Sequence, residues 1–64
     1  MNAQFSNEFI YTLKDGEIQA GSQKVLIVKF QNGDTAQKVA NETEKLVLEY
    51  LKQNHNESLV VKVE

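Results

Sequence analysis

The feature that most constrains the fold is residues 24–30, the densest apolar run in the chain. Its β-branched residues, and the Asn-Gly pair that soon follows, predict a strand. Leu26, Val28 and Phe30 fall on one face of this strand, and the other face carries Val25 and Ile27. Because both faces are apolar, the pattern predicts a central strand, or a sheet whose second face is covered.

A long amphipathic helix is predicted to follow, from about residue 34 to about residue 53. Its apolar residues recur at three- and four-residue spacing and fall within an arc of roughly 140°. They are Ala36, Val39, Ala40, Thr43, Leu46, Val47, Tyr50 and Leu51. Asp34 is the predicted N-cap, with Gln37 at the capping-box position. Leu48 falls outside the apolar arc and is a candidate exposed contact.

The chain begins with a polar segment, residues 1–7, which is predicted to be disordered, with Phe5 as the one residue that can fold back onto the core. Residues 8–13 then alternate between apolar and polar in the manner of a half-buried strand. The predicted core face of this strand carries Phe9, Tyr11 and Leu13. Tyr11 is therefore expected to lie in the core with its hydroxyl at the rim, as is Tyr50 of the helix.

A turn is predicted at Asp15-Gly16, since a two-residue type I′ turn needs positive φ at both central positions. Residues 17–20 can return as a short strand, and Gly21-Ser22 is a second break. Two arrangements fit: a three-strand meander, or one long hairpin whose arms are joined by a flexible loop over residues 14–23. The sequence leaves both open.

Residues 58–63 predict a final strand, which follows the helix after a short polar connection. A strand, a helix and a strand joined in this way form a right-handed crossover, so the last strand should run parallel to residues 25–30. The predicted fold is a two-layer α+β domain over residues 8–64. One helix packs on a mixed sheet of three or four strands, in the order β-(β)-β-α-β.

The composition excludes several classes of protein. The chain has 64 residues, no cysteine, seven basic and nine acidic residues and a formal charge of −2. It therefore has no disulfide framework, and its charge disfavours a general nucleic-acid binder. The N-terminus lacks the basic and apolar regions of a signal peptide, and no apolar run approaches the ~20 residues of a membrane span. A cytoplasmic location is expected.

No residue pattern predicts catalysis, a cofactor or a metal. His55 and Glu57 match half of a zinc deaminase signature, but the cysteine pair that completes it is absent. Ser58 is the one serine near His55 in sequence, and nothing around it resembles a nucleophile elbow. Asn32-Gly33-Asp34 has a single glycine rather than a phosphate-binding loop. The chain is therefore predicted not to be an enzyme.

The sheet face opposite the helix is the predicted interface. It should carry more aliphatic side chains than a solvated sheet face needs, with lysines beside them. The predicted interface residues are Ile10, Val25, Ile27, Lys29, Val60 and Lys62. Val25 and Ile27 are expected at its centre.

Two classes of function follow from this surface. The first is a non-enzymatic protein-interaction module that self-associates, as a dimer, or binds another protein. Such a module suits a regulatory, assembly or inhibitor role, including that of a phage or mobile-element accessory protein. The alternative is a weak nucleic-acid binder that uses Lys24, Lys29 and Lys62, although the face has no aromatic residue on which bases could stack.

Overall fold

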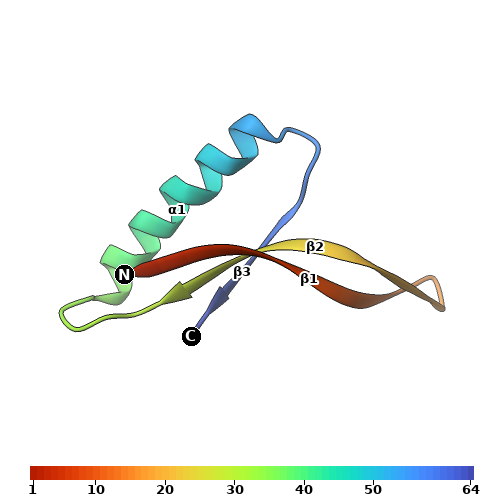
Figure 1. The fold of residues 1–64 in the computed structure, drawn as a ribbon, viewed down its shortest axis with the longest axis horizontal. Coiled ribbons are helices and arrows are strands. Elements are labelled where there is room, and N and C mark those ends of the chain that lie inside the picture. The colour runs from red at the N-terminus through yellow and green to blue at the C-terminus, as the bar shows by residue number, and fades with distance from the viewer.

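Three strands and one helix follow one another along the chain. The computed structural model describes residues 1–64. Its elements are β1 (Asn2–Lys14), β2 (Glu17–Lys29), α1 (Ala36–Gln53) and β3 (Leu59–Val63). The sheet order is β1-β2-β3, with β2 antiparallel to β1 and parallel to β3. Because α1 packs on one face of this sheet (Figure 1), the predicted two-layer α+β class and the parallel last strand are confirmed.

β1 and β2 form one continuous hairpin of two 13-residue strands. Asp15 and Gly16 connect them with φ values of 54° and 79°, the two positive values that the turn prediction requires. Of the two arrangements left open, the structure takes the long hairpin but without a flexible loop. Residues 17–20 are the start of β2, and Gly21 pairs with Ile10 inside the ladder instead of ending a strand.

The N-terminal segment is ordered, which corrects the prediction that residues 1–7 are disordered. The tight turn sets the register, so that Ala3 lies opposite Val28 and Phe5 lies opposite Leu26. The start of β1 therefore pairs with the most apolar part of β2. The ring of Phe5 also stacks on Tyr50 of α1, with centroids 5.3 Å apart.

The same register corrects the predicted core. Phe9 pairs with Ser22 and Tyr11 pairs with Ala20, beyond the region that α1 covers. Phe9, Tyr11 and Leu13 are exposed rather than buried. The positions next to the helix belong instead to Ala3 and Phe5.

The core lies between α1 and the middle of the sheet. Leu26, Val28 and Val39 are its fully buried members, and Val25 is buried on the opposite face of β2. Partly buried apolar residues surround the first three, namely Met1, Ala3, Leu46, Val47 and Leu59. With four of 64 residues buried, the chain has a thin core even for its length.

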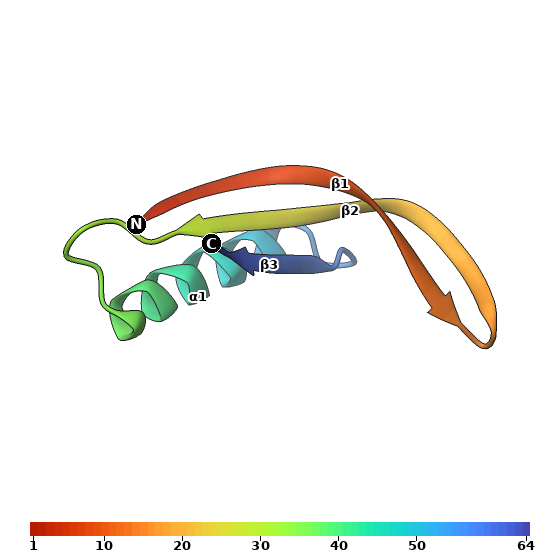
Figure 2. The same cartoon turned by 90° about the horizontal axis from the view of Figure 1, so that it is seen from below.

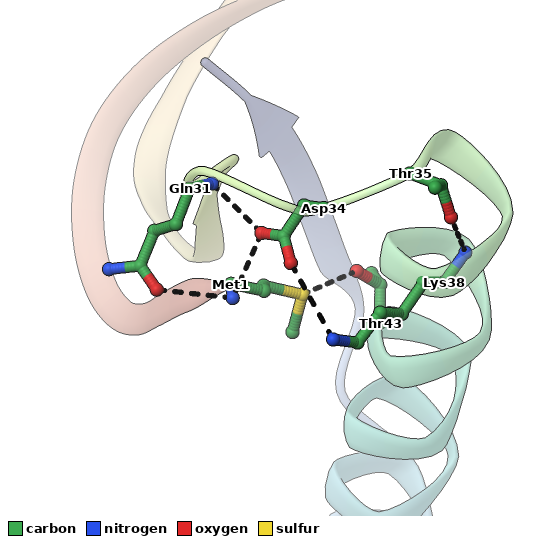
Figure 3. A network of polar contacts seen from close by, with 6 residues as sticks. All are labelled: Met1, Gln31, Asp34, Thr35, Lys38 and Thr43. Atoms are coloured by element: carbon green, nitrogen blue, oxygen red, sulfur yellow. Dashed lines mark hydrogen bonds and ion pairs between the residues drawn. The ribbon is translucent and has the colours of Figure 1, made fainter.

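The start of α1 differs by one residue from the prediction. Thr35, not Asp34, is the N-cap, and its hydroxyl oxygen accepts a hydrogen bond from the backbone N–H of Lys38 at 3.2 Å. The Asp34 carboxylate accepts a hydrogen bond from the backbone N–H of Gln31 at 2.8 Å and lies 2.9 Å from the Met1 amino group (Figure 3). Asp34 therefore ties the strand-to-helix turn to the start of β1.

The end of α1 is closed by polar contacts to Tyr50. The backbone and side-chain amides of Asn54 both donate to the Tyr50 carbonyl, at 3.0 and 2.9 Å. The Tyr50 hydroxyl donates to the Glu57 carboxylate, and this hydrogen bond raises the pKa of Tyr50 above its usual value. Asn54 and Glu57 therefore hold the connection between α1 and β3 against Tyr50, while His55 between them is exposed.

Candidate interaction surface

The face of the sheet opposite α1 gathers five of the six predicted interface residues. Val25 lies between Ser6 of β1 and Val60 of β3, and Ile27 lies beside Lys62. Lys29 follows on the same side of β2. Ile10 lies apart from this group, because its partner in the ladder is Gly21, four residues before Val25.

An ion pair crosses this face of the sheet. The ammonium group of Lys62 lies 2.6 Å from a carboxylate oxygen of Glu8, although the two residues belong to the two outer strands. The pair therefore spans β2 between them. Of the two residues predicted at the centre of the interface, Val25 is only 1% exposed and Ile27 is partly exposed.

The three lysines of the nucleic-acid hypothesis lie in different surroundings. The ammonium group of Lys29 lies 3.5 Å from a carboxylate oxygen of Glu64, and that of Lys62 lies 2.6 Å from a carboxylate oxygen of Glu8. Both lysines therefore have an acidic neighbour. Lys24 pairs with Asn7 and Leu59, which places it on the face that α1 covers rather than beside the other two. The three lysines of the alternative hypothesis are therefore not one cluster.

A second surface lies where the hairpin runs past the rest of the molecule. β3 pairs only with residues 24–28 of β2, so residues 8–23 form a two-stranded extension, here called the arm. The remaining residues, 1–7 and 24–64, are called the body. Both views show the arm reaching well beyond α1 and curving towards its tip (Figures 1 and 2). The molecule is 43 Å long as a result.

One face of the arm is apolar and uncovered. Four large side chains share this face, here called the arm patch: Phe9, Tyr11, Leu13 and Ile18. They are between 66% and 75% exposed, and the rings of Phe9 and Tyr11 meet edge to face with centroids 5.6 Å apart. Single exposed apolar residues are ordinary, but four neighbours on one face make this face a candidate contact surface.

A groove opens in the body between α1 and β3. Its volume is about 410 Å³, and it is here called the α1–β3 groove. Its lining residues are Phe30, Ala36, Val39, Ala40, Thr43, Glu44, Val61 and Val63. It stays open because α1 packs towards Met1, Ala3 and Phe5, at the other edge of the sheet. Two of these lining residues, Phe30 and Val63, remain exposed.

Among the polar side chains, no three histidine, aspartate or glutamate residues come together in a way that could bind a metal ion. Every buried polar side-chain atom has a hydrogen-bond partner. A second hollow of about 480 Å³ is lined only by polar residues, among them Gln23 and Ser58, which hydrogen-bond to each other. The arm patch and the α1–β3 groove are the two apolar surfaces that stay uncovered.

The chain contains no helix of the length and apolar character that crossing a membrane requires. Comparison with protein-family models, curated proteins and solved structures finds no match for this chain.

Proposed function

We propose that this chain is a non-enzymatic protein-interaction module that self-associates through its arm. The observation that carries this proposal is the arm patch, in which four large apolar side chains share one uncovered face. Apolar area removed from water is the main driving force of protein association, at about 25 cal/mol per Å². At the base of the arm Glu8 contacts Lys62 and Gln23 contacts Ser58, whereas the four side chains of the arm patch stay exposed.

The size of the arm patch fits a docking surface. An aromatic side chain offers roughly 150–250 Å², so Phe9 and Tyr11 leave on the order of 200–350 Å² exposed. With Leu13 and Ile18 the patch reaches on the order of 400 Å². That is within the range of about 300–600 Å² for the largest, often functional, patch on a monomer.

The proposed occupant is a second copy of this chain. A stable interface buries about 800 Å² on each partner, roughly twice what the arm patch supplies. The body carries the second apolar surface that is needed, because the α1–β3 groove is also uncovered. A chain of this length has difficulty building a sufficient core alone, and association adds buried area that the four-residue core lacks.

Nucleic acid is a poorer occupant for charge reasons. The arm contains Glu8, Asp15 and Glu17 but a single lysine, Lys14. Its charge of −2 would repel a phosphate backbone, and base stacking on Phe9 and Tyr11 would have to overcome that repulsion. The proposal therefore keeps a protein partner, in the cytoplasm, with a regulatory, assembly or inhibitor role for the resulting dimer.

The test is the mass of the protein against concentration, measured by analytical ultracentrifugation. We expect the wild type to form dimers at high micromolar concentration and Tyr11→Lys to remain monomeric with an unchanged circular dichroism spectrum. Thr12→Lys is the matched control, because it adds the same charge to the opposite face of the arm and should still dimerise. A monomeric wild type, or equal dimerisation of Tyr11→Lys, contradicts the proposal.

A further inference from the structure

We infer that the arm patch of each copy docks in the α1–β3 groove of the other, so that two copies exchange arms around a two-fold axis. This inference rests on the proposed self-association and specifies its geometry. An isologous dimer of this kind contains two identical arm-to-groove contacts. It differs from the simpler arrangement in which two arm patches pack directly on each other.

The arm patch and the groove are complementary in size. The groove is walled on the helix side by two small residues, Ala36 and Ala40, and it has about 410 Å³ of space. The arm supplies the opposite character, with large side chains such as Phe9 and Tyr11 that stand out from the strands. Large side chains that enter a depression lined by small ones pack at a density that flat apposition of two patches does not reach.

The arm is also long enough for the exchange. On β1, residues 8–14 extend seven residues beyond the part of the hairpin that β3 accompanies. At about 3.3 Å per residue they span roughly 23 Å. β3, which forms one wall of the groove, has five residues and spans roughly 17 Å. A partner's arm can therefore lie along the whole groove.

Charge favours an arm-to-body contact over an arm-to-arm contact. Glu8, Asp15 and Glu17 against Lys14 give each arm a charge of −2, whereas the six lysines and six acidic residues of the body cancel. Two arms packed together would place like charges side by side, which costs free energy at an interface. An arm on the body meets no net charge.

Buried area also favours reciprocal exchange over arm-to-arm packing. Arm-to-arm packing buries on the order of 400 Å² on each copy and leaves both grooves open. Reciprocal exchange buries the arm and the groove of each copy at once, which approaches the roughly 800 Å² of a standard interface. Exchange also closes the assembly at two copies, whereas a one-way arm-to-groove contact would propagate into a chain.

Disulfide cross-linking tests this geometry cleanly because the natural chain has no cysteine. One set of variants carries a single cysteine on the arm, and the other set carries one in the groove. They are Phe9→Cys, Tyr11→Cys and Leu13→Cys for the arm, and Ala36→Cys, Ala40→Cys and Val63→Cys for the groove. Each arm variant is mixed with each groove variant, refolded together and oxidised. Thr12→Cys, on the opposite face of the arm, is the matched control.

The inference predicts that at least one arm-and-groove mixture forms a covalent dimer, because disulfides need Cα atoms within about 7 Å. Each variant alone, and every mixture with Thr12→Cys, should give no more than background. Ala40→Glu should also lower the dimer fraction at least tenfold, while Gln37→Glu, on the polar side of α1, should not. Helical circular dichroism reports whether both remain folded.

Three results would overturn the inference. Efficient cross-linking of an arm variant with itself means that arm packs on arm. An Ala40→Glu protein that dimerises like the wild type means that the groove is not used, and particles larger than dimers mean one-way docking. In these cases self-association itself survives. A wild type that is monomeric at all concentrations removes the proposed function together with the exchange.

Discussion

The body and the arm share the strand β2, yet they use its apolar residues in opposite ways. In the body, Leu26 and Val28 are flanked by β1 and β3 and covered by α1, and both are fully buried. In the arm, Ile18 has only β1 beside it and nothing above it, and it is 75% exposed. The difference shows that burial here depends on the reach of α1 and β3, not on the residues of the strand.

The two regions should accordingly differ in their own stability. A two-stranded hairpin is at best marginally stable in water, whereas three strands with a packed helix can fold independently. The arm's backbone ladder is complete, but its side chains bury little area. The arm is therefore an extension that the body supports, and under the proposed self-association a second copy would cover it.

The largest expected effect separates a body leucine from an arm leucine. Leu26→Ala should lower the free energy of unfolding by about 2–5 kcal/mol, since it leaves a cavity in the buried cluster. Leu13→Ala should change it by no more than about 0.5 kcal/mol at concentrations where the protein is monomeric, because Leu13 is exposed. Urea unfolding followed by circular dichroism measures both, and equal losses would erase the distinction between body and arm.

A smaller effect is expected at the tip of the arm. Gly16→Ala should cost about 1–2 kcal/mol, because φ is 79° there and a left-handed conformation strains residues with a Cβ atom. Gly21→Ala is the matched control: its φ is not positive and a Cβ would contact nothing within 4 Å, so it should be neutral or slightly stabilising. Melting temperatures of the two variants decide. A stable Gly16→Ala protein would argue against the two-residue turn.

An effect of about 1 kcal/mol is expected at the start of α1, within the body. Thr35→Ala removes the acceptor of the Lys38 backbone N–H and should destabilise the protein by that amount. Thr35→Ser preserves the hydroxyl and should restore most of the loss. Thermal unfolding measures the three proteins, and an unchanged melting temperature for Thr35→Ala would mean that the helix is capped elsewhere.

The smallest expected effect is one of pH and also belongs to the body. The backbone N–H of Gln31 lowers the pKa of Asp34 from its ordinary value of 3.8, with help from the Met1 amino group and Lys38. The ionised carboxylate therefore favours the folded state above pH 3.8, and this contribution is lost as the pH falls through the lowered value. Asp34→Asn should unfold with a shallower dependence on acid than the wild type. Acid unfolding curves of the two proteins with the same dependence on pH would contradict this role of Asp34.

The body was largely predictable from sequence because its signals are local. Alternation, helical spacing and the crossover rule predicted α1, β3 and their parallel pairing, and the structure bears out these elements. The helix start was displaced by one residue because Asp34 and Thr35 can both cap a helix, and Asp34 is engaged by Gln31. That choice depends on where Met1 and Lys38 lie in space.

The pairing of β1 and the outer face of the sheet were not predictable in the same way. Asp15-Gly16 correctly indicated the turn. The turn also sets which residues of the two strands pair, and this pairing extends to residues 2–7, which were predicted to be disordered. Counting outwards from that turn would have paired Phe5 with Leu26 and left Phe9, Tyr11 and Leu13 beyond the helix. The outer face of the sheet was not predictable for another reason, since the Glu8–Lys62 ion pair joins strands that are far apart in sequence.

Hydrogen exchange at two protein concentrations tests most directly whether the arm is a docking surface. At dilute, monomeric concentration, backbone amides of residues 8–23 should exchange much faster than those of residues 24–28, which lie between two strands. At high micromolar concentration, protection of the arm should rise severalfold and that of residues 24–28 should change little. Arm amides that exchange at the same rate at both concentrations would contradict the proposed docking.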